Sequence, residues 1–433
     1  MQVRLAYGRS ELEVDFPDDR TVDLVEKQPV SALGEPEAAL RHGLEHPIGA
    51  RPLREIARGR RDAVIVLSDA TRPVPNALLV PPILDALRAG GLPPEAVALQ
   101  IATGLHRPAT PAELDEMLGA ELARSLKIVQ HDARDAEAHA DLGRTSGGIP
   151  ILIDRFFLER DLRIATGLIE PHLMAGYSGG RKAICPGLAA LATVRVAHGP
   201  AMLEAKVGPG IVEGNPFHQG LLEIVRQVGV DFLVNLSLDR DRRVAGIFCG
   251  DVEQAHAQGM AFVERESLVA LDEPADLVVT SGGGHPLDAT FYQAIKGISA
   301  ASGIVKPGGF ILLCASLSEG CGSASFEKLL RECESPRDFE LRLDDDRFFE
   351  PDQWMVQHLC QAHRRARLLL YTDGMPAEAV RELLVEPVPS PAAGIERALA
   401  ALPARARIAV LPQGPSVLAT LRGEKRPLGA PIA

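Results

Sequence analysis

Short apolar runs that alternate with helical segments constrain the fold of this chain more than any other feature. Residues 63–67, 96–102 and 163–168 are three such runs, and a helical pattern over residues 78–88 separates the first two. Continuous apolar runs of this length are typical of buried parallel strands, because helices cover both faces of such a sheet. The pattern resumes near residue 275. It therefore predicts an α/β fold of two α/β domains, with mostly parallel sheets and a cleft between them.

A charged segment just before the second series of strands indicates a domain boundary. We expect an N-terminal cofactor-binding domain over residues 1–268, opening with a β-hairpin. A C-terminal domain over residues 269–394 would contribute substrate-binding residues. The strand-like run at residues 407–411 suggests that residues 395–433 return to complete the first domain.

Charge and composition exclude several classes of protein. The 433 residues include 46 Lys plus Arg and 58 Asp plus Glu, a net charge of −12. Binding to nucleic acid or to an anionic membrane needs a basic face, so neither partner is expected. No stretch approaches the roughly 20 apolar residues of a spanning helix, and the first residues do not read as a signal peptide. Six cysteines without a C-x-x-C pair indicate reduced thiols in a cytoplasmic protein.

Polar side chains follow each of the first three predicted strands. Asp69 and Arg72 follow the first, His106 the second and His172 the third. Ligands of open α/β sheets bind outside the carboxyl ends of the strands. We therefore expect these four side chains to converge.

The glycine-rich run over residues 170–187 is the strongest local signal. Its turn is made by Tyr177, Ser178, Gly179 and Gly180, and Lys182 follows at once. Backbone N–H groups in such a turn can hold phosphate. No Ser or Thr follows the lysine, so the P-loop motif fails and a nucleoside triphosphatase is disfavoured. A purely structural turn before a helix is the alternative.

Other candidates are a histidine near a helix end and one face of a helix in the second half. His198 precedes a Gly-Pro helix stop, and the histidines do not have the spacing of H-E-x-x-H. A predicted helix over residues 287–302 can project Tyr292, Gln293 and Lys296 to one side. Together they suit a small carboxylate, although a solvated face is the alternative. Trp354 lines a pocket or fills the core.

These motifs, in this order along most of the chain, resemble the nickel-pincer lactate racemase family. The resemblance is carried by residues 68–75, 102–108, 170–187 and 292–297, together with His198. It implies a racemase or C2-epimerase of a small anionic 2-hydroxy acid, of the lactate type or larger, including sugar acids. Hydride would leave the substrate reversibly, through a 2-keto acid intermediate.

The resemblance also implies roles for the residues. Lys182 would hold a pyridinium mononucleotide through a thioamide, and His198 would be the protein ligand to its nickel. Sulfur, carbon and imidazole donors suit square-planar Ni(II). His106 and His172 would be the acid/base residues. Separate enzymes that synthesise this cofactor would be partners.

The remaining candidates would bind the substrate and the rest of the cofactor. The implied substrate-binding residues are Arg72, Tyr292, Gln293, Lys296 and Trp354. The implied residues for the nucleotide part and phosphate are Asp69, Arg72, Tyr177, Ser178, Gly179 and Gly180.

Three other functions stay open at this stage. A NAD-dependent 2-hydroxy-acid dehydrogenase needs G-x-G-x-x-G after a strand, which residues 281–285 do not fit. A non-catalytic nickel-nucleotide carrier would have no use for both His106 and His172. A zinc hydrolase would use the histidines as metal ligands.

Overall fold

The computed structural model describes residues 1–345 and 348–423. Its first sheet has six strands, in the order β13 (Val244–Gly250), β12 (Phe232–Leu238), β9 (Leu162–Leu168), β4 (Ala63–Ser68), β5 (Val97–Ala102) and β6 (Lys127–Gln130). Neighbouring strands are parallel, except that β12 and β13 are antiparallel. The three runs predicted as strands are therefore β4, β5 and β9.

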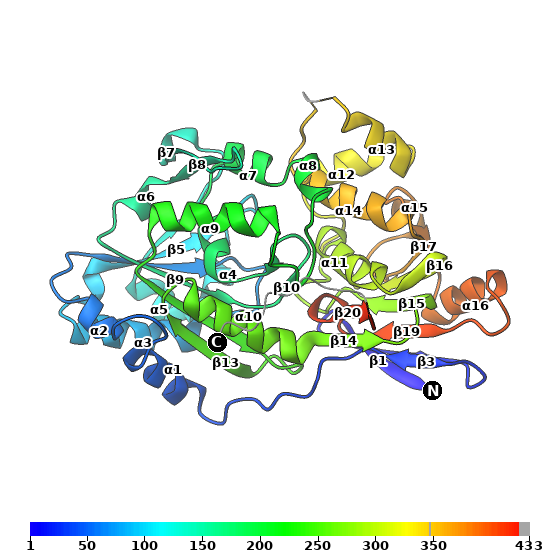
Figure 1. Cartoon of the computed structure of the whole chain (residues 1–433), viewed down its shortest axis with the longest axis horizontal. Helices are drawn as coiled ribbons and strands as arrows, with labels where there is room; N and C mark the ends of the chain where they lie inside the picture. Colours follow the sequence, from blue (N-terminus) through cyan, green and yellow to red (C-terminus); the bar gives the residue numbers. More distant parts are fainter. Residues whose placement is uncertain (346–347, 424–433) are drawn as a thin grey trace.

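Burial on both faces explains the continuous apolar runs of this sheet. In β4, Val64 and Val66 pack on one side with Phe217 of α9 (Pro216–Val228). Ile65 packs on the other side with Ile83 of α3 (Asn76–Ala89). These side chains are fully buried. Helix α10 (Gln254–Ser267) also covers β12 and β13 (Figure 1).

The second sheet is parallel throughout. Its order is β18 (Glu386–Pro387), β17 (Ala366–Tyr371), β16 (Val305–Cys314), β15 (Ala275–Ser281), β19 (Ile408–Leu411) and β3 (Val22–Leu24). Helices α11 (Phe291–Ser302) and α14 (Gln353–His363) pack together near one face, and α16 (Pro391–Ala401) packs on the other. Figure 1 shows the two sheets side by side, which confirms the predicted α/β class.

The two ends of the chain correct the expected domain organisation. Strand β19 pairs with β15 and β3 in the second sheet and does not return to the first. The predicted hairpin is present as β1 (Gln2–Tyr7) and β2 (Ser10–Asp15), but it packs against the second sheet. An apolar run such as β19 suits either sheet, so only the tertiary structure selects one. Residues 424–433 lie outside the described residues, and the boundary near residue 268 stays a prediction.

Shorter elements complete the fold. The paired strands are β7 (His139–Arg144) with β8 (Pro150–Asp154), β10 (Pro171–His172) with β11 (Gly176–Tyr177), and β14 (Leu268–Leu271) with β20 (Leu418–Leu421). The remaining helices are α1 (Pro36–Glu45), α2 (Leu53–Ile56), α4 (Pro111–Leu118), α5 (Ala120–Ser125), α6 (Arg155–Leu158), α7 (Leu191–Ala197), α8 (Pro200–Leu203), α12 (Ala324–Arg331), α13 (Pro336–Arg342) and α15 (Ala377–Arg381). None of the helices in the described ranges is long and apolar enough to cross a membrane.

Two helix starts illustrate how local sequence sets the boundaries. Thr110 and Glu113 form a capping box at the start of α4. The helix predicted over residues 287–302 begins later, at Phe291, because the side chain of Thr290 accepts a hydrogen bond from the N–H of Gln293.

Candidate active site

One cavity lies between the carboxyl ends of the first sheet and the helices of the second domain. The first domain lines it with Asp69, Arg72, Thr103, His106, His172, Ser178, Gly179, Lys182 and His198. The second domain contributes Tyr292, Gln293, Lys296, Asp352, Trp354 and Met355. Side chains far apart in the sequence therefore converge as expected.

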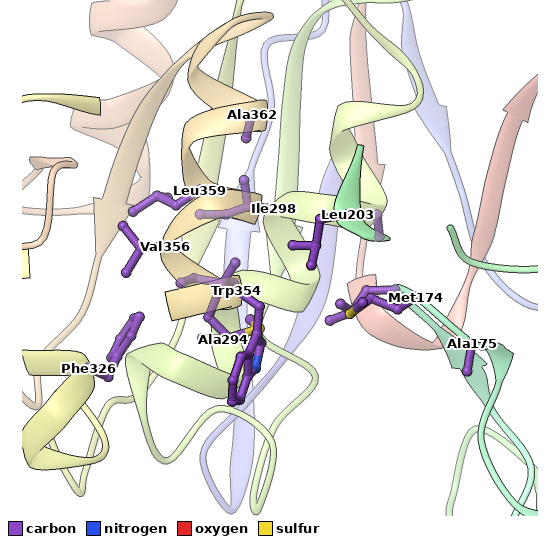
Figure 2. Packing of buried hydrophobic residues seen from close by; sticks show 14 of the residues in the cluster. Met174, Ala175, Leu203, Ala294, Ile298, Phe326, Trp354, Val356, Leu359 and Ala362 are labelled. Atoms are coloured by element: carbon purple, nitrogen blue, oxygen red, sulfur yellow. The ribbon is translucent and has the colours of Figure 1, made fainter. Parts of the chain in front are cut away.

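Apolar packing closes this cavity where the two domains meet. Trp354, Ala294 and Phe326 of the second domain belong to the same buried cluster as Met174 and Leu203 of the first domain (Figure 2). Trp354 is 5% exposed. The predicted pocket-wall residue thus lines the cavity and also forms part of the core.

Asp69 fixes the ring of His106. Its Oδ2 lies 2.6 Å from His106 Nδ1, and its Oδ1 accepts a hydrogen bond from Thr71 Oγ1 at 2.8 Å. Burial opposes ionisation of the carboxyl, but His106 and Arg72 together lower the pKa of Asp69 below its ordinary value. His106 Nδ1–H therefore donates a hydrogen bond to the carboxylate of Asp69. This leaves His106 Nε2 available to accept a proton from a ligand.

His172 is held differently, by backbone donors and Lys182. Its Nδ1 accepts hydrogen bonds from the N–H groups of Met174 and Ala175, at 3.2 and 3.1 Å. The single proton of the neutral ring must then lie on Nε2, which is 2.6 Å from Lys182 Nζ. Burial is the main cause that lowers the pKa of His172 well below its usual value.

The surroundings of Lys182 favour the neutral form of its amine. Burial, followed by the charges of Arg72, Lys296 and Arg181, lowers its pKa well below the ordinary lysine value. A neutral amine accepts the Nε2–H of His172 and is nucleophilic.

Arg72 gives the cavity a positive charge, and Lys296 lies on the opposite domain of the same cavity. Burial, and then Arg72, lowers the pKa of Lys296 well below its usual value, and Lys296 Nζ donates to Gln293 Oε1. A carboxylate placed between Arg72 and Lys296 would favour the ammonium form of Lys296, because an opposite charge stabilises it. The pair suits an anionic ligand.

His198 presents one ring nitrogen to the cavity. Its Nδ1 donates to the backbone oxygen of Val194 at 3.1 Å, which leaves Nε2 unprotonated. Burial, and then Lys182, lowers the pKa of His198 to about 3. Its ring packs against Phe217 and Trp354, with centroids 4.9 Å away in each case. A neutral, fixed imidazole of this kind can supply one metal ligand.

The glycine-rich turn differs from the expected phosphate cradle. The Ser178 N–H donates to the oxygen of Glu170 at 2.9 Å, and the Gly180 N–H donates to Asn235 Oδ1 at 2.8 Å. Tyr177 lies outside the cavity, buried in an apolar cluster with Ile169 and Val263. Because these N–H groups already have protein acceptors, they are not free donors; of the turn, Ser178 and Gly179 line the cavity.

Sequence reasoning missed Asp352 and the residues that support the His106 loop. Thr103 lies in this loop, and its Oγ1 donates to the backbone oxygen of His131 at 2.7 Å. His131 Nε2 lies 3.0 Å from His139 Nε2, so two buried imidazoles anchor the loop. Their only sequence signal is an eight-residue spacing, which is not diagnostic of contact.

Lowering the pH from 7 to 5 is expected to destabilise the fold by about 2 kcal/mol for each of His131 and His218. Burial lowers the pKa of His131 and that of His218 to about 3. For His131, the neighbouring His139 adds to this effect. The unfolded histidines take up protons below about pH 6.5 and the folded ones do not, so stability falls as the pH drops from 6.5 towards 3. Urea unfolding at pH 7 and pH 5 measures the free energy of unfolding of the wild type and of His131→Gln. The loss of stability between the two pH values should be smaller in the variant. An equal loss in both proteins would contradict this role of His131.

Comparisons with known proteins agree with this architecture. Residues 7–209 match the lactate racemase N-terminal domain, and residues 271–419 match the lactate racemase C-terminal domain. Lactate racemase of Thermoanaerobacterium thermosaccharolyticum is 32% identical over 422 residues, 96% of this chain and 98% of that protein. Lactate racemase of Lactiplantibacillus plantarum is 31% identical over 423 residues, 96% and 99% of the two chains.

Solved structures show the same likeness. The lactate racemase apoprotein from T. thermosaccharolyticum superposes with a TM-score of 0.90 at 32% identity, covering 97% of this chain and 100% of that one. A Thermotoga maritima protein shares the fold, with a TM-score of 0.69 at 20% identity over 89% and 98% of the chains. The fold and these matches define an isomerase of the racemase class. The chain belongs to the lactate racemase family, as its motifs predicted.

Proposed function

We propose that this protein interconverts the C2 stereoisomers of a small 2-hydroxy acid of the lactate type, using a nickel-pincer nucleotide attached to Lys182. One observation carries the proposal: Lys182, whose pKa is held well below the ordinary lysine value, lies in one cavity with His198, the two histidines His106 and His172, and the Arg72–Lys296 pair. Both named relatives are lactate racemases. Larger 2-hydroxy acids, including sugar acids, belong to the same proposal.

The residues fit such a cofactor. The amine of Lys182 could form a thioamide with a thiocarboxylic acid group of the cofactor, with loss of water, because only the unprotonated amine is nucleophilic. In the described ranges, no group of three or more His, Cys, Asp or Glu side chains could hold a metal ion. A zinc hydrolase needs three protein ligands, whereas a metal held mostly by its cofactor needs only a ligand such as His198. Bound there, the group would accept hydride from C2 reversibly and so give access to a 2-keto acid.

The chain's own residues would orient the substrate and move its hydroxyl proton. Arg72 and Lys296 would hold the carboxylate, which fixes C2 in the cavity. His106, with a free Nε2, would accept the hydroxyl proton of one enantiomer. Packing of Trp354 and Met174 would exclude water and limit escape of the keto acid.

His172 would serve the other enantiomer. Its Nε2–H now donates to the amine of Lys182. A thioamide nitrogen no longer accepts a hydrogen bond, so attachment at Lys182 would release the Nε2–H of His172 to the substrate. To accept a hydroxyl proton at Nε2, His172 would first have to carry its ring proton on Nδ1, which requires the N–H groups of Met174 and Ala175 to turn away. With that change of tautomer the two histidines would alternate as acid and base.

Intact mass of protein from a host that makes the cofactor tests the proposal. We expect a covalent adduct at Lys182, about one nickel per chain, and equilibration of both enantiomers in a panel of chiral 2-hydroxy acids. Protein from a host without the cofactor pathway is the control and should be inactive. Uptake of solvent deuterium at C2 would indicate proton abstraction and contradict the proposal, and net keto acid formation with NAD would indicate a dehydrogenase.

A further inference from the structure

A buried arginine precedes Lys182 in the chain. Arg181 is 1% exposed, although Lys182 lines the cavity and both belong to the same short helical turn, Gly180–Ala183. Within the described ranges, no carboxylate forms an ion pair with Arg181, and its Nε has no hydrogen-bond partner. Burial lowers the pKa of Arg181 to about 9, so the guanidinium stays charged at neutral pH. A buried charge without an opposite partner costs stability, which points to a use for this charge.

The Arg181 guanidinium joins the helical turn to the hairpin that carries His172. Its Nη2 donates to the backbone oxygen of Ala175 at 2.5 Å and, more weakly, to that of Tyr177 at 3.4 Å. Both acceptors follow His172 in the hairpin of β10 and β11. The N–H of the same Ala175 donates to His172 Nδ1. A single residue, Ala175, therefore connects Arg181 to the ring of His172.

Helix α10 holds the guanidinium from another direction. Arg181 Nη1 lies 3.3 Å from Nδ1 of His256, and His256 Nε2 donates to the backbone oxygen of Ser178 at 2.8 Å. Burial lowers the pKa of His256 well below its ordinary value, so its ring has one proton, on Nε2, and accepts at Nδ1. Gly180 lets the turn approach this ring, because its φ is 52° and a Cβ there would lie 2.6 Å from His256 Cγ. The arginine and the glycine-rich turn are thus fixed together.

Both contacts and charge of Arg181 affect the Lys182 amine. With backbone donors on its Nδ1, His172 keeps its ring proton on Nε2, which lies 2.6 Å from Lys182 Nζ. Only an unprotonated amine can accept that hydrogen bond, because an ammonium group has no lone pair. After burial and the charges of Arg72 and Lys296, the charge of Arg181 also lowers the pKa of Lys182. The contacts and the charge therefore favour the same form of the amine.

We propose that Arg181 is a positioning residue that keeps the Lys182 amine unprotonated and directed at His172 until a cofactor attaches to it. The arginine does so by tying the helical turn of Lys182 to the hairpin of His172. A lysine would be a poor replacement, because burial of this degree would leave a lysine partly uncharged at neutral pH. This inference rests on the proposed function, in which Lys182 is the point of attachment.

The pH profile of Lys182 acetylation in the unloaded, full-length protein tests this role. Acetic anhydride reacts with the unprotonated amine, and peptide mass mapping follows Lys182 separately from the exposed Lys206, the internal standard. Scaling each profile to its own plateau at high pH removes differences in accessibility. Arg181→Met removes both the charge and the link, and should raise the pH of half-maximal acetylation by about one unit. Arg181→Gln keeps N–H donors without the charge and should give a smaller rise. The other charged or titratable groups around the cavity stay the same in these variants: Asp69, Arg72, His106, His198, Lys296 and Asp352.

Arg163 provides the matched control for a purely structural role. Its guanidinium likewise donates to backbone oxygens, those of Val228 and Leu158, but it lies near the amino end of β9, away from the cavity. Arg163→Met should lower the Tm and leave the acetylation profile of Lys182 unchanged.

Two results would overturn different parts of this account. A wild-type profile in both Arg181→Met and Arg181→Gln would overturn the role of Arg181, and if Arg181→Met does not fold, Arg181→Gln alone decides. A wild-type protein that gains no adduct at Lys182 in a cofactor-producing host would instead overturn the proposed function. The acetylation profile is measured without the cofactor, so the two results are independent.

Discussion

Replacing Lys182 with Met is expected to lower racemisation more than about 10⁴-fold, because the residual reaction would lack the group that provides most of the rate enhancement. The same variant should show no covalent adduct by intact mass. Lys182→Met should also raise the free energy of unfolding at pH 7. The reason is that the pKa of Lys182 lies well below its ordinary value in the folded protein, so folding disfavours the charged amine that the unfolded chain carries.

The direction in which Lys182→Met changes the free energy of unfolding distinguishes a functional role of Lys182 from a structural one. Because the folded pKa of Lys182 lies below the unfolded one, wild-type stability rises with pH up to about 10.5, and the methionine variant should lose that dependence. The exposed Lys206 provides the matched control, since Lys206→Met should retain the adduct and the activity. An inactive, destabilised Lys182→Met would indicate a structural role and contradict the assignment.

Replacing His106 with Ala is expected to lower kcat by about 10²–10⁴-fold in both directions, with little change in KM. Both directions suffer because the residue that takes the hydroxyl proton from one enantiomer returns it when that enantiomer re-forms. Initial rates from each pure enantiomer, followed by chiral chromatography, measure the effect.

Asp69→Asn tests how His106 is held. The amide can donate to Nδ1 and so favour the wrong tautomer, with the ring proton on Nε2, and we expect a loss of kcat that approaches that of His106→Ala. The exposed His42 offers the control, because His42→Ala should leave the rates unchanged. Full activity in both His106→Ala and Asp69→Asn would contradict the assignment of His106 as the residue that accepts the hydroxyl proton.

Sequence reasoning predicted the strands and the residues at their ends because both depend on local signals. Apolar runs of the kind that is buried on two faces predicted β4, β5 and β9. Because ligands of open α/β sheets bind outside the carboxyl ends of the strands, the residues at these ends, Asp69, His106 and His172, were then predicted to converge. The ordered motifs also predicted the family. The glycine-rich turn shows the limit of local pattern, since its N–H groups turned out to be bound by Glu170 and Asn235.

The sequence by itself determined the α/β class, the family and the set of residues at the strand ends, because periodicity and motif spacing are properties of short segments. Only the tertiary structure decided that β19 and β3 join the second sheet, that burial lowers the pKa of Lys182 and that Asp352 lines the cavity. Each of these depends on partners up to nearly 400 residues away or on burial from water. Burial and long-range contact arise only when the whole chain packs, so no local pattern encodes them.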